Sequence, residues 1–205
     1  WLWPIDGKSF YDINNNNYLV HIDWSKNSKE DYQKLSQDFF ECGYKICEKI
    51  VDSGHDNIKS DMWFFPTMYL FRHGMELGLK ALICGAISEK RKIQQIFLDC
   101  KHDLYMLFDA YERETAILLT EEEYGWMKKY LHSLEEVDAK SDFFRFPLED
   151  EFLLNYQNKF LDIVDMANSM LQAYGIIQKC LEIQEENRID RFDALRSSVF
   201  LQFAN

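Results

Sequence analysis

Four ionisable side chains interrupt the most apolar stretch of this chain, WFFPTMYLFRHGMELGLKALICGAI at positions 63–87. Arg72, Glu76 and Lys80 follow one another at intervals of four, so on a helix they align along one face, with His73 at its flank. We call these four residues the charged seam. If buried, they could form a self-neutralising network that fixes helix register, because buried charges must be paired. They could instead line a polar pocket for a ligand, and both interpretations stay open at this level.

A second candidate site is His102 with Asp103, at the predicted start of a short helix. One of the two could cap that helix by accepting hydrogen bonds from its first N–H groups. Alternatively, a neighbouring group could hold the imidazole in place, and His102 could then exchange a proton near neutral pH.

The third candidate is the loop predicted at 138–148, DAKSDFFRFPL. A guanidinium between two phenylalanines suits the recognition of a phosphate or a carboxylate. The aromatic residues could equally fix this loop to the bundle while Arg145 pairs with Glu76 or an aspartate. Together the three candidates give the predicted ligand-binding residues Arg72, Glu76, Lys80, His102, Asp103, Asp138, Ser141 and Arg145.

The three candidates carry the motifs FRHGMELGLKALI, KHDL and D-x-x-S-x-x-FRFP, in that order along the chain. This combination, over roughly residues 60–180, resembles HEPN-like domains. Those are helical bundles widespread in prokaryotic defence and toxin–antitoxin systems, and many of them are metal-independent ribonucleases that act as dimers. The resemblance implies a module of a defence or stress system, with a partner protein that could be encoded nearby.

The ribonuclease signature of that family is an arginine followed four to six residues later by a histidine. No arginine of this chain has a histidine at that distance. We therefore expect a binding or regulatory module whose polar pocket takes a nucleotide, RNA or a partner. One alternative is a ribonuclease effector in which His102 or His73 removes the 2′-hydroxyl proton, while Arg72 or Arg145 would be the catalytic cation. The other alternative is a helical dimerisation scaffold.

The composition predicts an all-α protein. With 47% hydrophobic and 16% aromatic residues the chain can bury a sizeable core, and 8 glycines and 3 prolines in 205 residues argue against many turns. A net charge of −12 disfavours broad binding to nucleic acid or an anionic membrane, although a small local site for nucleotide or RNA is compatible with it. Charges within the apolar stretch also disfavour a membrane span.

Five cysteines without a C-x-x-C pair favour reduced core thiols in a cytoplasmic protein. No two histidines have ligand spacing on a helix, so we predict no metal site, and no cofactor.

Hydrophobic periodicity predicts an antiparallel bundle of four main helices plus short helices. Ser60 is predicted to cap the central helix, and Thr120 with Glu123 to form the capping box of the next long one. The four main helices are expected near 28–52, 62–87, 120–137 and 149–186. The predicted divisions are a small irregular or hairpin N-terminal arm at 1–27, the bundle at 28–187 and a C-terminal amphipathic helix at 188–205.

Small residues occupy the face of the central helix opposite the charged seam, where they predict close packing of another backbone. They are Thr67, Gly74, Gly78, Ala81 and Gly85. This face and the amphipathic pattern at 189–203 together predict a homodimer.

Overall fold

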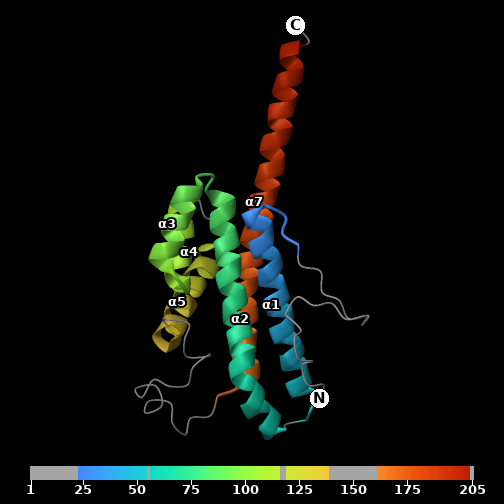
Figure 1. The fold of residues 1–205 in the computed structure, drawn as a ribbon, viewed down its shortest axis with the longest axis vertical. Helices are drawn as coiled ribbons and strands as arrows, with labels where there is room; N and C mark the ends of the chain where they lie inside the picture. The colour runs from blue at the N-terminus through green and yellow to red at the C-terminus, as the bar shows by residue number, and fades with distance from the viewer. Residues whose placement is uncertain (1–22, 55, 116–118, 139–160, 204–205) are drawn as a thin grey trace, which may run out of the picture.

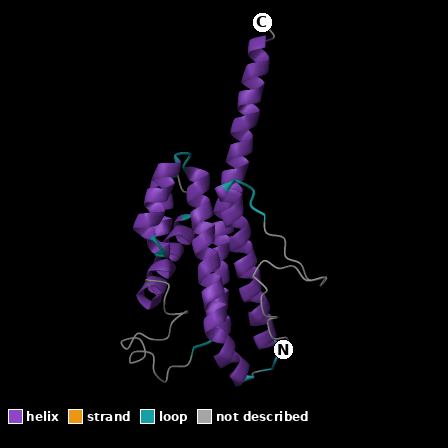
Figure 2. Cartoon of the chain, in the orientation of Figure 1, coloured by secondary structure: helices purple, strands orange, loops and turns teal. Residues whose placement is uncertain are grey.

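The computed structural model describes residues 23–54, 56–115, 119–138 and 161–203, with side chains described up to residue 190. The part it describes is helical and contains no strand (Figure 2). Its helices are α1 (Ser28–Val51), α2 (Asn57–Ala86), α3 (Lys90–Cys100), α4 (Leu104–Glu114), α5 (Glu121–Asp138) and α7 (Ile163–Phe203). The predicted all-α bundle of long helices with short ones between them is confirmed. Most of the predicted N-terminal arm lies outside the described residues.

Helix α1 occupies the range that its sequence predicts, Ser28–Val51. The side chain of Asn27 accepts a hydrogen bond from the Lys29 N–H, at 3.2 Å, and so caps the helix. Acidic residues in the first turn favour the same start, because they interact well with the positive end of the helix dipole. The helix then runs alongside α2 over most of its length (Figure 1).

Helix α2 begins one turn earlier than the sequence predicts. Its cap is Asp56, whose carboxylate accepts hydrogen bonds from the N–H groups of Ile58 and Lys59, at 3.1 and 3.3 Å. The predicted cap, Ser60, lies inside the first turn and donates its hydroxyl to the Asp56 carbonyl. The helix continues through Pro66. The Asp56 carboxylate gives a partner to two N–H groups of the first turn, and this cap lets the helix begin before Ser60.

The small-residue face of α2 packs against other helices of the same chain. A Cβ atom added at Gly74 would lie 2.8 Å from a ring carbon of Phe40 and 3.2 Å from the Ser36 carbonyl oxygen, both on α1. At Gly78 it would lie 2.8 Å from Ile177 on α7. The predicted close packing is therefore confirmed, and the chain itself covers this face. Homodimerisation stays a prediction that rests only on the C-terminal amphipathic pattern.

Helix α2 is the centre of the described bundle, since it contacts α1, α3, α4 and α7. Its side chains Phe71, Met75 and Leu79 are completely buried. Helix α5 packs on α4 and α7 and does not lie directly against α2. It reaches α2 through charged side chains, and these belong to the candidate site below.

Helix α7 runs without a break from Ile163 to Phe203, and its C-terminal half projects beyond the other helices (Figure 1). Its predicted start near 149 lies outside the described residues, and the predicted boundary at 187/188 falls within the continuous helix. None of the helices in the described part of the chain has both the length and the apolar composition that a membrane crossing requires.

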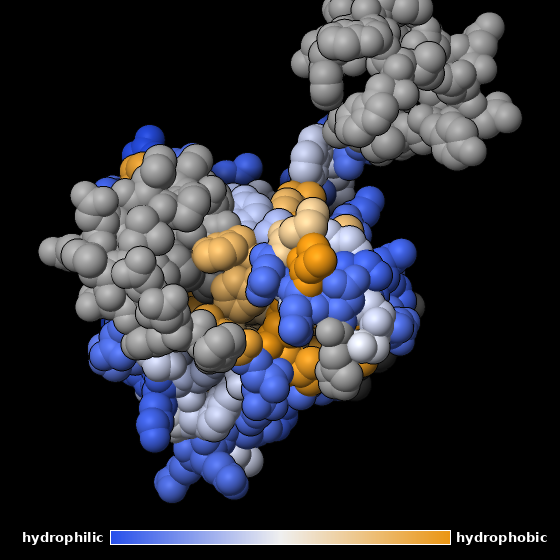
Figure 3. All heavy atoms as spheres, turned by 90° about the horizontal axis from the view of Figure 1, so that it is seen from below, coloured by the Kyte–Doolittle hydropathy of each residue, from blue (hydrophilic) through white to orange (hydrophobic). Residues whose placement is uncertain are grey.

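The opposite end of the bundle exposes apolar side chains in the first turns of α2. Ile58, Met62 and Phe65 are spaced four and three residues apart and are 71%, 66% and 37% exposed. Figure 3 views this end and shows apolar surface framed by hydrophilic residues. The same face of α2 continues through Tyr69 towards Glu76, because these positions recur at helical spacing.

Candidate acid–base site around Glu76

The Glu76 carboxylate lies at the centre of the charged seam and is buried, with 1% of its side chain exposed. Lys80 Nζ lies 2.5 Å from its Oε1, and His102 Nδ1 lies 3.0 Å from the same oxygen. His73 Nδ1 and Arg72 Nη1 are further away, at 3.9 and 3.8 Å from Oε2. Lys80 and His102 are therefore the direct partners of the carboxylate, whereas the other two groups act at longer range.

The electrostatic surroundings keep Glu76 ionised. Burial alone would raise the pKa of its carboxyl group. Interactions with His73 and Lys80, together with the nearby imidazole of His102, outweigh burial and lower the pKa to about 2. Because His73 lies beyond hydrogen-bond reach, we assign the larger part of this stabilisation to the two closer partners. The site thus contains a permanent buried negative charge.

The His102 ring is held by a hydrogen bond on one side and is partly exposed to solvent. Its Nδ1 faces Glu76, while 49% of its side chain is exposed. An ionised carboxylate only accepts hydrogen bonds, so it selects the form of the imidazole in which Nδ1 carries a proton. Among the described residues, no partner contacts Nε2. This atom is left to accept a proton or, once protonated, to donate a hydrogen bond to a ligand.

The backbone of the α3–α4 turn is also fixed. Arg72 Nη2 donates a hydrogen bond to the His102 carbonyl oxygen at 3.0 Å. Two residues later, the Leu104 N–H donates to Glu135 Oε1 at 2.8 Å. Lys101, the residue before His102, has φ 51° and ψ −106°, a combination that residues with a Cβ rarely adopt. The turn is thus strained where it presents His102, and its neighbours hold it there.

Arg72 lies at the buried side of the site and has no exposed surface. Its Nη2 also donates to the Asp138 carbonyl at 2.9 Å, and its Nε lies 3.0 Å from Asp138 Oδ2 in an ion pair without an aligned hydrogen bond. Glu135 Oε1 lies 3.4 Å from Nη2. A guanidinium this enclosed cannot touch a ligand in this conformation. Its role is to connect α2, the α3–α4 turn and the C-terminal end of α5.

Glu135 is the residue of the site that the sequence analysis missed. Burial raises the pKa of its carboxyl to about 7, although the Leu104 N–H and the Arg72 charge oppose that rise. A signal for it exists in the sequence. The apolar face of α5 is built on Leu131 and Leu134, and Glu135 and Asp138 continue that face at positions four and seven after Leu131. Carboxylates that prolong an apolar seam indicate a buried partner cation.

The structure thus brings together most of the predicted site residues. His102 contacts the charged seam directly, and Asp138 pairs with Arg72 at its buried side. Asp103 caps α4, because its carboxylate accepts the Met106 N–H at 2.7 Å, and Glu76 holds the imidazole of His102; proton exchange by His102 stays a prediction. The remaining predicted residues, Ser141 and Arg145, lie outside the described residues.

Aromatic rings flank the exposed groups of the site. His73 is 25% exposed and lies against Phe39 in an edge contact and against Tyr69 in a stacked one. Lys80 Nζ lies 5.6 Å from the centre of the Phe97 ring. Rings at these positions exclude water from one side of each cation, and this strengthens its interaction with an anion.

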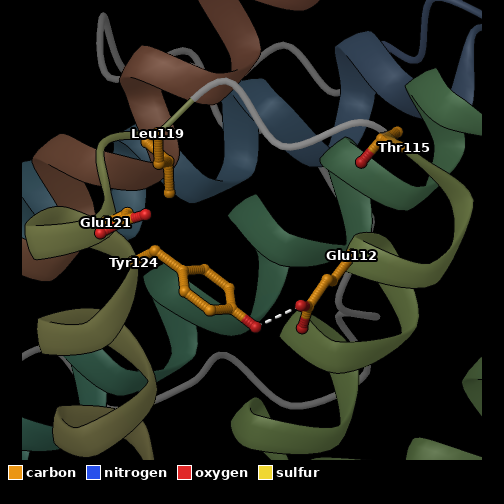
Figure 4. Close-up of a pocket in the computed structure, with 5 residues that line it drawn as sticks. All are labelled: Glu112, Thr115, Leu119, Glu121 and Tyr124. Carbon is orange, nitrogen blue, oxygen red and sulfur yellow. Dashed lines mark hydrogen bonds between the residues drawn. The ribbon is translucent and has the colours of Figure 1, made fainter.

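A second polar feature is an open hollow between α4 and α5, lined by Glu112, Thr115, Leu119, Glu121 and Tyr124. Figure 4 shows the Tyr124 hydroxyl pointing at the Glu112 carboxylate, to which it donates a hydrogen bond. Lys128 Nζ lies 2.9 Å from the same carboxylate. The Tyr124 hydroxyl, the Glu112 carboxylate and the Lys128 ammonium group thus satisfy one another.

Chemically, the Glu76 cluster can hold an anion and transfer a proton. In the described part of the chain, no group of three or more histidine, cysteine or acidic side chains is placed to bind a metal ion. Comparisons with protein-family models, with curated proteins and with solved structures find no match. The argument about function therefore rests on the geometry of the site.

Proposed function

We propose that the protein is a HEPN-like binding or regulatory module that recognises a phosphate-bearing ligand, a nucleotide or an RNA end, at His102. One observation supports this most: the half-exposed imidazole donates Nδ1–H to the buried carboxylate of Glu76. Because the carboxylate fixes the ring, protonated Nε2 would point a charge-assisted donor at a phosphate oxygen. Lys80 supplies further positive charge beside it.

The acidic surface fits a small ligand better than a long nucleic acid. The net charge of −12 repels an extended phosphate backbone, whereas one phosphate at a local group of cations needs only short-range contacts. The apolar and aromatic face of α2 that leads from Phe65 through Tyr69 to His73 could contact a base next to that phosphate.

A second candidate function, metal-independent RNA cleavage, draws on the same contact. In neutral His102 the Nδ1–H is held by Glu76, so the lone pair on Nε2 is exposed and could remove a 2′-hydroxyl proton. The arrangement of a buried carboxylate, an oriented imidazole and an exposed ring nitrogen is the one that activates histidine as a base. We rank it second, because Arg72 is buried and cannot stabilise the charged phosphate.

The test is a titration of the purified protein with adenosine 5′-monophosphate and with a short single-stranded RNA carrying a terminal phosphate. The side-chain resonances of His102 are followed by NMR. We expect them to shift on binding, and we expect His102→Ala to weaken binding about tenfold or more. The variant also loses one hydrogen bond to the buried Glu76 carboxylate, so its melting temperature should fall, and binding is compared at a temperature at which both proteins are folded.

His132→Ala is the matched control. This histidine is also exposed, at 70% of its side chain, but lies on α5, one turn before the exposed Glu136. It should leave binding unchanged. If neither probe shifts His102 at millimolar concentration, or if both variants weaken binding equally, the proposal is wrong. RNA cleavage that disappears in folded His102→Ala would establish the second candidate instead.

A further inference from the structure

We propose that Glu135 is a positioning residue for His102, acting through the α3–α4 turn. This inference rests on the proposed function, in which His102 is the group that meets the ligand. Glu135 lies on α5 and contacts the backbone of the turn at Leu104. The inference gives this residue a role in the site through that backbone contact.

The geometry places Glu135 and Arg72 on either side of the His102 backbone. Arg72 Nη2 donates to the carbonyl of His102 itself, at 3.0 Å. Glu135 Oε1 accepts the N–H of Leu104, at 2.8 Å, and lies 3.4 Å from the same Nη2. The His102 carbonyl and the Leu104 N–H are thus held by two side chains that also contact each other. Removing the Glu135 side chain therefore removes one of the two side-chain hydrogen bonds that hold the backbone between His102 and Leu104.

A simple helix-capping role does not account for this placement. Asp103 already caps α4 with its own side chain, and Leu104 is completely buried, so water does not satisfy the N–H that Glu135 accepts. Glu135 is instead largely buried, with 10% of its side chain exposed. The groups that face it are Arg72 from α2, Asp103 from the start of α4 and Asp138 from its own helix.

The burial of Glu135 also costs stability, since it raises the pKa of the carboxyl to about 7. Its second oxygen, Oε2, is buried without a hydrogen-bond partner in the described structure. A buried carboxylate with one unsatisfied oxygen is unfavourable for folding alone. The backbone of Lys101, next to His102, is strained. A strained turn persists only where its surroundings hold it, and Glu135 is one of the groups that hold this turn.

The decisive measurement is the NMR signal of the His102 ring nitrogens in the free protein, which needs no ligand. In the wild-type protein Nδ1 should carry the proton, because Glu76 accepts it. In Glu135→Ala we expect the His102 signals to move towards those of a free imidazole in tautomeric exchange. The affinity for adenosine 5′-monophosphate should fall about tenfold, as is typical when a supporting group is removed behind a site residue.

Conservative variants separate positioning from general damage. Glu135→Gln keeps an oxygen that can accept the Leu104 N–H, so the His102 signals and ligand affinity should stay close to wild type. Glu135→Asp keeps the charge but withdraws it by one methylene group, so it should behave like Glu135→Ala. Glu136→Ala, at an exposed neighbour on the same helix, should change nothing.

Unchanged His102 signals in folded Glu135→Ala, or in Glu135→Asp if the alanine variant does not fold, overturn the inference. A shift of the His102 signals in Glu135→Gln as large as in Glu135→Ala would also overturn the inference. The hydrogen bond to the Leu104 N–H would then not be what positions His102. The two proposals fail separately. Wild-type protein that does not bind the nucleotide refutes the proposed function, whereas the test on the ring nitrogens of the free protein still decides the role of Glu135.

Discussion

Two clusters of charged side chains in this bundle differ in what lies at their centre. At the α4–α5 hollow the centre is a cation, Lys128, which contacts the carboxylates of Glu112 and Asp109 at 2.9 and 3.6 Å. The rings of Tyr105 and Tyr124 cover it at 5.4 and 5.3 Å. In the site described above, the centre is the Glu76 carboxylate, and cations and imidazoles surround it.

This difference decides which cluster can do chemistry. Hydrogen bonds with Tyr124 and Glu112 raise the pKa of Lys128, so its ammonium group stays charged and neither gives up nor takes a proton. A central carboxylate instead uses only one nitrogen of each neighbouring imidazole. The other nitrogen of His102 has no hydrogen-bond partner among the described residues, and about half of the side chain is exposed. The clusters also differ in burial, because Lys128 is 24% exposed whereas Arg72 has no exposed surface.

The largest expected difference between the clusters is the response to loss of a cation. Arg72→Met should reduce the free energy of unfolding by about 3–5 kcal/mol, because it removes the cation paired with the buried Asp138 carboxylate and the donor of the hydrogen bond to the His102 carbonyl. Urea denaturation followed by circular dichroism measures this loss. A change below about 1 kcal/mol would mean that water reaches the cluster, and the contrast with the α4–α5 hollow would disappear.

A smaller effect is expected from Glu135, and it depends on pH. The pKa of the Glu135 carboxyl is about 7 in the folded protein and close to its ordinary value of 4.5 in the unfolded chain, so the folded state binds this proton more tightly. Its contribution to stability is complete below pH 4.5 and is lost as pH rises through 7. Glu135→Gln mimics the protonated group. It should therefore be more stable than wild type by about 2–3 kcal/mol at pH 8.5 and nearly equal to it at pH 4.5.

Denaturation of wild type and Glu135→Gln across this pH range measures the difference in their free energies of unfolding. In this difference the contributions of all other carboxyl groups cancel.

Glu76 shows the opposite dependence on pH. Its folded pKa of about 2 lies below the unfolded value, so its contribution is present above pH 4.5 and is lost as pH falls through 2. A stability difference between Glu135→Gln and wild type that does not grow from pH 5 to 8.5 would contradict the raised pKa of Glu135.

The smallest effect should come from the α4–α5 hollow. Lys128→Met removes ion pairs whose members are 24–38% exposed, and such pairs contribute up to about 1 kcal/mol. The loss should shrink further at high salt, because exposed charges are screened. The same denaturation measurement applies, and the His102 signals should not change. A loss as large as that of Arg72→Met would show that the two clusters do not differ as described.

Several features of the fold could be read directly from the sequence because they depend on neighbours within one helical turn. Thr120 and Glu123 form the predicted capping box, in which each side chain accepts the backbone N–H of the other residue, at 3.2 and 3.0 Å. Asn27 caps α1 in the same local way. The position of the α2 cap could not be predicted, because Asp56 and Ser60 are both good caps and the sequence does not say how far the helix extends.

The candidate site could be predicted in part. The alignment of Arg72, Glu76 and Lys80 follows from helical periodicity alone, and this is why the sequence determined their shared face and the existence of an acid–base cluster. Only the tertiary structure decided which member is buried, which is open and what they meet. His102 lies 26 residues from Glu76 in sequence, and Glu135 lies 63 residues from Arg72. Such contacts depend on how α3, α4 and α5 pack around α2, and packing of distant segments is not encoded in the spacing of residues along one helix.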